Sequence, residues 1–285
     1  MFNAYSMSVV DFILNIAGLL LWSNWRAIPF STPPPQPGKS LVSALRPTGR
    51  STPRINYLAA LVTLLVVRAI LYWQLGAQID WIPRIPLGPV TVWFRSDLLG
   101  RMLLFSFLSF GVALGILYLC LLLMSWVAAR PADTDPTRRL IRAHLGMLDR
   151  WPTAMKMLLP LIVTAAVWCV SYPILVKLRI VPSDIHSPWL VVAQGAVIGL
   201  AAYLTLKFFL VAVLALYFLN SYVYLGEFPL WSFVNVAALG LLRPIKWIPL
   251  RAGKIDFAPA VAIVVVVVCA QFSQQALSQL YQKLI

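Results

Sequence analysis

Few groups in this sequence could carry chemistry, and their spacing favours no catalytic centre. Glu227 is the single glutamate, and neither a phosphate-binding glycine loop nor a Gly-x-Ser-x-Gly nucleophile motif is present. His144 and His186 stand alone, and no Cys-x-x-Cys or His-x-x-x-His pair offers zinc or haem ligands. We therefore predict that the protein is not an enzyme and has no cofactor.

Two cations, Arg68 and Lys207, lie inside long apolar stretches. An ionisable residue within a membrane span is a functional hypothesis by default. Arg68 lies about 13 residues into its stretch, so we expect it to snorkel to the outer interface as a structural anchor. Lys207 lies deeper, and its candidate partners are a separate protein or one of the polar residues Asp11, Asn15, Gln194 and Asn220.

The composition indicates that the apolar stretches containing Arg68 and Lys207 are membrane spans. Of the 285 residues, 61% are hydrophobic and only 11% are charged, whereas a soluble domain is about 25% charged. A hydrocarbon core about 30 Å thick takes about 20 apolar residues in a helix. Six stretches qualify, and we predict an all-α polytopic membrane protein with spans near 7–28, 55–75, 102–128, 156–178, 189–225 and 258–280.

The basic residues predict the topology, because Lys and Arg are retained on the cytoplasmic side. The segments after the first, third and fifth spans hold 15 Lys and Arg in total, against 6 in the other extramembrane parts. We therefore expect a multi-pass protein of the inner, cytoplasmic membrane with both termini outside the cytoplasm. We therefore expect the net charge of +14 to serve contacts with anionic lipid headgroups, and we do not expect nucleic acid as a partner.

The three basic segments also resemble one another. Each has a proline-bearing turn, a short helical stretch and an arginine close to a proline, at 33–47, 130–152 and 227–244. We infer three copies of one hairpin unit, span, surface helix, span, and divide the chain into 1–80, 81–180 and 181–285, with the first two copies degenerate.

The middle copy predicts an amphipathic helix that starts at Pro136 after an Asp135 N-cap. Ile141, His144 and Leu145 share its apolar face, and the arginines lie opposite. Such a helix either rests in the membrane interface or packs on neighbouring loops; we favour the interface, with lipid phosphates bound by Arg138, Arg139 and Arg142.

The third copy contains the most distinctive run, LLRPIKWIPLRAGKIDFAPAVAIVVVVV at 241–268. It resembles the YggT family of bacterial and plastid membrane proteins, and Ala258 departs where that family commonly has serine. The matching motif residues are Arg243, Pro244, Pro249, Arg251, Gly253, Ile255, Asp256 and Pro259.

Without the family, this run predicts a charge-balanced turn leading back into the membrane, rather than a binding site. Gly253 allows the turn, Asp256 can pair with Arg251 and help cap the next helix, and Lys246 is left for lipid phosphates.

Two further patterns concern helix contacts. Gly111 with Gly115, and Gly195 with Gly199, form Gly-x-x-x-Gly pairs that predict close helix packing within the monomer. Polar residues of the last span repeat at helical spacing and predict an extension that lies on the outer surface, docks a partner or packs on its own bundle; they are Gln271, Gln274, Gln275, Ser278, Gln279 and Gln282.

These features favour a non-catalytic protein that organises or helps to assemble other membrane components. The YggT resemblance implies roles linked to cell division, nucleoid organisation or cytochrome maturation, and selects none of them. The alternatives are a small-solute or ion transporter or channel, and a fixed subunit of a larger membrane complex.

The topology can be tested with a fluorescent reporter that folds only in the cytoplasm. Fused after residue 285, it should stay dark, because the positive-inside rule places the C-terminus outside. The same reporter inserted after Arg150, in a predicted cytoplasmic segment, is the control and should fluoresce. Cytoplasmic fluorescence from the C-terminal fusion would overturn the assignment.

Overall fold

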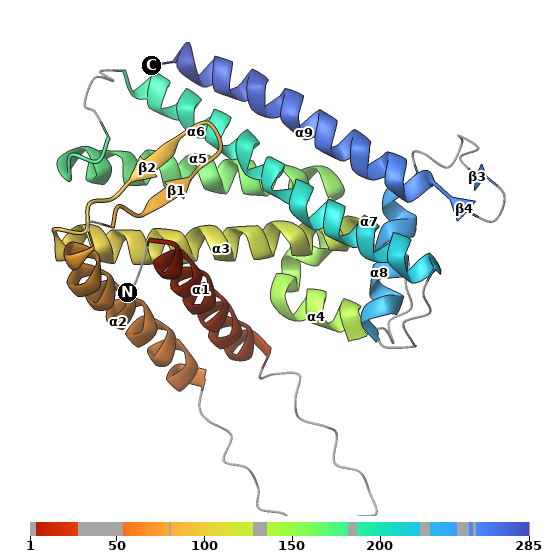
Figure 1. Ribbon diagram of the computed structural model, residues 1–285, viewed down its shortest axis with the longest axis horizontal. Coiled ribbons are helices and arrows are strands. Elements are labelled where there is room, and N and C mark those ends of the chain that lie inside the picture. Colours follow the sequence, from red (N-terminus) through yellow and green to blue (C-terminus); the bar gives the residue numbers. More distant parts are fainter. Residues whose placement is uncertain are drawn as a thin grey trace, which may run out of the picture. The chain divides into compact units, whose positions relative to one another are not determined.

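The computed structural model describes residues 4–27, 54–79, 81–127, 136–181, 187–222, 229–243, 251–252 and 255–284. These residues are almost entirely helical (Figure 1). The six predicted spans are confirmed as helical segments that are long and apolar enough to cross a membrane. The six segments are Met7–Arg26, Arg54–Gly76, Leu99–Val127, Thr153–Lys177, Pro188–Ser221 and Ala258–Gln282.

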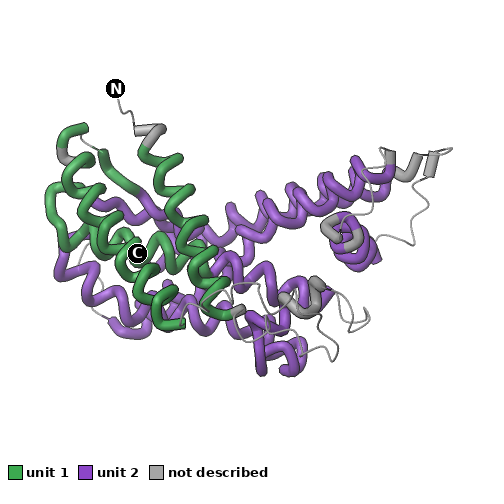
Figure 2. The backbone as a smooth tube through the Cα atoms, turned by 90° about the horizontal axis from the view of Figure 1, so that it is seen from below, with its two compact units in different colours: residues 1–83, 95–114 green, residues 84–94, 115–285 purple. Residues whose placement is uncertain are grey.

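The chain forms two compact units (Figure 2). Unit 1 comprises Met1–Pro83 and Arg95–Leu114, and unit 2 comprises Arg84–Phe94 and Gly115–Ile285. The chain passes between the units before and after residues 84–94, and a third time within one continuous helix, α3 (Leu99–Val127). These units group the chain differently from the three predicted hairpins, which remain a prediction about sequence repeats.

Unit 1 contains α1 (Ala4–Ala27), α2 (Arg54–Gln78) and the first half of α3. Its apolar core is small and forms where the three helices meet, around Leu61, Leu65 and Phe110. A cluster of aromatic rings lies nearby, in which Tyr72 and Trp81 have ring centroids 5.0 Å apart and Phe105 contacts both.

In unit 2, α5 (Thr153–Lys177) packs along α6 (Pro188–Ala202). A Cβ at Gly199 would lie 2.9 Å from the carbonyl oxygen of Leu161, and one at Gly195 would lie 3.1 Å from that of Ala165. This Gly-x-x-x-Gly pair therefore permits the close approach predicted for it. At Gly111 and Gly115 a Cβ would meet no described atom within 4 Å, so this pair makes no such contact among the described residues.

The fifth span is one rod interrupted by a single 3-10 turn, η4 (Tyr203–Thr205), between α6 and α7 (Leu206–Tyr222). Two side chains secure the interruption. The Tyr203 hydroxyl donates to the carbonyl of Met157 on α5, and Thr205 Oγ1 donates to the carbonyl of Ala202 at 2.6 Å. The predicted single span is thus confirmed as one helical segment long and apolar enough to cross a membrane, with a local change of helix type that the sequence did not indicate.

A β-hairpin that the sequence did not predict follows α2. Strands β1 (Arg84–Pro86) and β2 (Thr91–Trp93) pair antiparallel, and the Leu87 N–H donates to the Val90 carbonyl at 2.7 Å beside the turn. Gly88 takes a positive φ of 79° there and touches the methyl group of Ala201. Since Ala201 lies about 20 Å along α6 from Pro188, the turn packs far along a membrane-spanning helix.

Two short helices join spans in unit 2, where surface helices were predicted: α4 (Pro136–Leu145) and α8 (Pro229–Leu241). Helix α4 begins at Pro136, as expected. Ile141 and Leu145 are buried in a core shared with the end of α3, with α7 and with α8. The apolar face of α4 is therefore covered by protein, which favours the alternative of packing on neighbouring elements. The first predicted surface helix, 33–47, lies outside the described residues.

The last helix, α9 (Ala258–Gln282), has Pro259 in its first turn, as predicted. Its N-cap is Phe257, whose side chain makes no capping hydrogen bond. Before it, β3 (Arg251–Ala252) pairs antiparallel with β4 (Ile255–Asp256), with Arg251 opposite Asp256 in the register.

The role of the α5–α6 contact can be measured with a matched pair of variants. Gly199→Leu should lower the free energy of unfolding by about 1–3 kcal/mol, because the new side chain must displace the α5 backbone. Gly111→Leu is the control, since a Cβ there meets no described atom. Melting temperatures of the purified proteins in one detergent would decide, and equal shifts for the two variants would contradict the packing.

Candidate functional site

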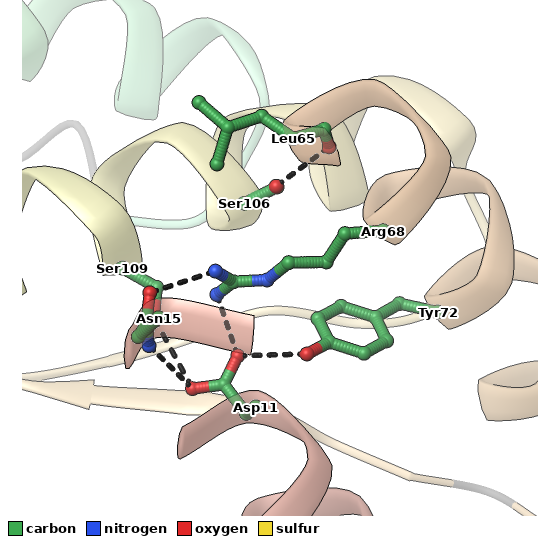
Figure 3. A network of polar contacts seen from close by, with 7 residues as sticks. All are labelled: Asp11, Asn15, Leu65, Arg68, Tyr72, Ser106 and Ser109. Atoms are coloured by element: carbon green, nitrogen blue, oxygen red, sulfur yellow. Dashed lines mark hydrogen bonds and ion pairs between the residues drawn. The ribbon is translucent and has the colours of Figure 1, made fainter. Parts of the chain in front are cut away.

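Polar side chains from three helices of unit 1 meet inside the candidate membrane region (Figure 3). Asp11 and Asn15 are one helical turn apart on α1, Arg68 and Tyr72 are one turn apart on α2, and Ser109 comes from α3. Residues four apart lie on the same helix face. We call these five residues the polar clasp.

The ion pair between Arg68 and Asp11 is the centre of the polar clasp. Arg68 Nη2 lies 2.6 Å from Asp11 Oδ1, and Arg68 Nη1 donates to Asn15 Oδ1 at 2.7 Å. The Arg68 side chain is 0% exposed and that of Asp11 is 21% exposed. The guanidinium carbon also lies 5.4 Å from the centre of the Tyr72 ring, within cation–π range.

Both carboxylate oxygens of Asp11 accept further hydrogen bonds. The Tyr72 hydroxyl donates to Oδ1 at 3.0 Å. Asn15 Nδ2 and Ser109 Oγ each lie 3.2 Å from Oδ2. A buried ion pair is favourable only when its remaining donors and acceptors are also satisfied, and this carboxylate meets that condition.

A neighbouring hydrogen bond joins two of these helices, α2 and α3. Ser106 is fully buried, and its hydroxyl donates to the Leu65 carbonyl at 2.8 Å. The bond and the polar clasp tie α1, α2 and α3 together through groups that cannot be left unpaired in hydrocarbon. The arrangement is thus suited to fixing helix positions.

This geometry corrects two expectations. Arg68 does not snorkel to the interface, because its side chain is fully buried and paired with Asp11. Asp11 and Asn15, which were candidate partners of Lys207, bind Arg68 instead. The sequence signal that could have identified the polar clasp is the one-turn spacing of Asp11 with Asn15 and of Arg68 with Tyr72.

Lys207 lies at the start of α7 and is half-buried. Its Nζ is 5.1 Å from the centre of the adjacent Phe208 ring. The other residues proposed as partners are placed differently: Asn220 Nδ2 donates to Asn235 Oδ1 at 3.3 Å, and both amide atoms of buried Gln194 lack a hydrogen-bond partner among the described residues. Lys207 is not part of the polar clasp, and it therefore stays a candidate functional residue.

A second polar cluster joins the ends of two spans in unit 2. Lys156, near the start of α5, donates to Ser125 Oγ on α3 at 2.8 Å and to the Asp149 carbonyl at 2.6 Å. Asp149 belongs to η3 (Gly146–Arg150), and its Oδ1 accepts from Ser125 Oγ at 2.6 Å. Lys156 is buried, and it holds α3, η3 and α5 together.

The residues predicted to contact lipid are only partly described. Arg142 is about half exposed, with Nε 3.8 Å from Asp149 Oδ2, and Arg243 is exposed. Arg138 and Arg139 lie on α4, with side chains outside the described part. Lys246, Pro244 and Gly253 also lie outside the described residues. Headgroup contacts of these cations stay a prediction.

The polar residues of α9 form a surface that we call the glutamine face. It comprises Gln271, Gln274, Gln275, Ser278, Gln279 and Gln282, which together line a shallow groove. The glutamines are exposed, and Ser278 is partly exposed. No other described element of unit 2 lines this groove, so within that unit the row does not pack on its own bundle.

Comparisons of the chain with protein-family models, with curated proteins and with solved structures returned no match. Within the described ranges, no group of three or more His, Cys, Asp or Glu side chains is placed to hold a metal ion. Geometry alone therefore characterises the site. The chain is a multi-pass membrane protein whose first unit contains an internally paired charge.

The polar clasp predicts a strong asymmetry between single and double variants. Arg68→Met should lower the free energy of unfolding by about 3–5 kcal/mol, because it leaves the Asp11 carboxylate unpaired. Adding Asp11→Leu should recover most of that loss, since no charge then remains to be paired. Thermal unfolding in detergent, followed by tryptophan fluorescence, measures both.

The control for this pair is Arg95→Met. Arg95 is 73% exposed and lies 3.8 Å from Asp97, so its loss should change stability by about 0.5 kcal/mol or less. A double variant that is less stable than Arg68→Met alone would contradict the role assigned to the ion pair.

Proposed function

We propose that this chain is a non-catalytic, YggT-like protein of the inner membrane that organises or helps to assemble other membrane components. The observation that carries the proposal is that the Asp11 carboxylate of the polar clasp is fully engaged in hydrogen bonds. Asp11 is the one acidic residue within the described candidate spans, and its carboxylate is bonded by four side chains. A carboxylate so engaged serves structure better than it serves proton or ion coupling.

The arrangement of the joining helices supports the same proposal. Helices α4 and α8 both follow a span and both pack on one core with the end of α3, although α8 carries no charged residue. Exposed cations border them, Arg142 on α4 and Arg243 just after α8. On a cytoplasmic face such a platform would rest on anionic headgroups and leave its surface to a partner.

The YggT resemblance and the repeated hairpin remain part of this proposal. Three features are compatible with the motif where it is described: exposed Arg243, the β3–β4 backbone register that sets Arg251 opposite Asp256, and buried Pro259 at the start of α9. The resemblance implies roles linked to division, nucleoid organisation or cytochrome maturation, and a non-catalytic membrane bundle could serve any of them.

A transporter is the second candidate, because one span combines features that transporters use. Its helix changes type at Tyr203–Thr205, Lys207 follows directly, and buried Gln194 has an unsatisfied amide among the described residues. Interrupted helices beside polar groups are typical of substrate sites in transporters.

One pair of measurements separates the two functions. The full chain, purified in mild detergent, should copurify with a membrane protein in fixed stoichiometry, measured by mass spectrometry. Reconstituted in liposomes, it should leave the leak of protons and of small cations at the level of empty vesicles.

Lys207→Met should leave both results unchanged, as should the matched control Lys177→Met at the exposed end of α5. Flux through the wild-type protein that Lys207→Met abolishes and Lys177→Met spares would establish transport and reject the assembly role.

A further inference from the structure

The glutamine face is unusual for a helix that spans a membrane. Its positions recur every three or four residues, as in the series Gln271, Gln275, Ser278 and Gln282, so they follow one side of α9 over three turns. Each glutamine presents two N–H donors and one carbonyl acceptor. The whole row is neutral, because it contains no acidic or basic residue.

Counting along α9 places part of this row at the expected depth of the hydrocarbon. Helix α9 begins at Ala258, shortly after strand β4, and about 20 residues of helix cross a hydrocarbon core. Counted from Ala258, Gln271, Gln274 and Gln275 fall before the helix leaves that core. Amides at this depth have no water to bond and need a polar partner.

Unit 2 itself does not supply that partner. The side of α9 that packs on the unit is marked by Pro259, Ala262, Ala270 and Tyr281, all buried. The groove along the glutamine face is lined by α9 residues alone, and the side chains of its five glutamines are exposed. Figure 1 shows α9 running as a continuous rod to its C-terminal end.

We propose that the glutamine face binds the same face of a second copy of this chain, so that α9 forms the interface of a homodimer. The row is complementary to itself, because each amide supplies both the donor and the acceptor that its counterpart needs. A partner recognised through charge would require charged residues, which this face lacks. Two copies inserted with the same topology are related by a two-fold axis along the membrane normal, so equal residue numbers meet across the interface.

The dimer has a specific geometric consequence for cross-linking. Ser278 lies in the middle of the glutamine face, whereas Cys269 is exposed nine residues earlier, which is two and a half turns and therefore the opposite side of α9. A disulfide forms only when the two Cβ atoms can approach to about 4.5 Å or less. Ser278→Cys should therefore link to its equivalent in the second copy, and Cys269 should not.

The experiment uses the full chain in native membranes. Cys120, Cys169 and Cys269 are replaced by alanine, and Ser278→Cys is added; the matched control replaces only Cys120 and Cys169 and keeps Cys269. After mild oxidation, non-reducing electrophoresis should show a band of twice the chain mass as the main product for Ser278→Cys, and mostly monomer for the control. Equal dimer yields would overturn the proposal, because they would indicate random collision.

A second set of variants tests the hydrogen bonds themselves. In the Ser278→Cys background, combined Gln271→Leu, Gln274→Leu and Gln275→Leu changes should reduce the dimer band several-fold, since leucine cannot replace the amide pairing. A monodisperse gel-filtration peak for each variant would show that the variant still folds. An undiminished band, a cross-link to a protein of another mass, or a Ser278→Cys thiol that gives only monomer would each overturn the proposal.

This inference does not rest on the proposed function. A chain that copurifies with no other protein, or that conducts ions in liposomes, would reject the assembly role and leave the Ser278 cross-link as expected. Conversely, loss of the cross-link would reject the homodimer without affecting the search for a membrane partner.

Discussion

A polar group that enters hydrocarbon is costly unless the protein itself pairs it, and this constraint accounts for much of the structure described here. A charge at membrane depth is expensive unless an opposite charge and further hydrogen bonds satisfy it. The two terminal nitrogens of Arg68 are paired with Asp11 and Asn15, although its Nε has no partner among the described residues, and Asp11 is also bonded by Tyr72 and Ser109. The hydrogen bonds of the polar clasp thus offset the cost of burying two charges, and they hold three helices together.

The same constraint acts on the backbone. The β1–β2 hairpin can lie against α6 because its strands satisfy one another's amides, and Gly88 has no side chain to hold it away from Ala201. The 3-10 turn in the fifth span is similarly supported by hydroxyl groups, those of Tyr203 and Thr205. Irregular backbone therefore occurs at positions where the protein provides hydrogen bonds or close packing.

The spans themselves were predictable because their signal is local and strong. Runs of about 20 apolar residues, with few charges, are sufficient to identify all six helices within a few residues of their ends. Pro136 and Pro259 mark the starts of α4 and α9 for an equally local reason, since proline tolerates the first turn of a helix. The β1–β2 hairpin was missed because its three-residue strands contain Pro86 and are flanked by further prolines, which argue against a strand.

The pairing of polar groups was not predictable in the same way. The sequence identifies Arg68 and Lys207 as the cations that need an explanation, yet Asp11 could have served either of them. Which helix lies beside Asp11 depends on packing between segments more than 50 residues apart in the chain. Likewise, the helical spacing of the apolar residues in α4 predicts an apolar face but does not reveal whether lipid or protein covers that face.

By itself, the sequence determined that this is a helical membrane protein, how many times it can cross, and which residues are costly to bury, because these properties depend only on the transfer of individual side chains out of water. Tertiary structure alone decided that Arg68 is clasped by Asp11, that Ile141 and Leu145 face a protein core, and that the glutamines of α9 point away from unit 2. Those outcomes depend on which helix faces meet, and the free energy of such a contact belongs to both partners and cannot be read from either one.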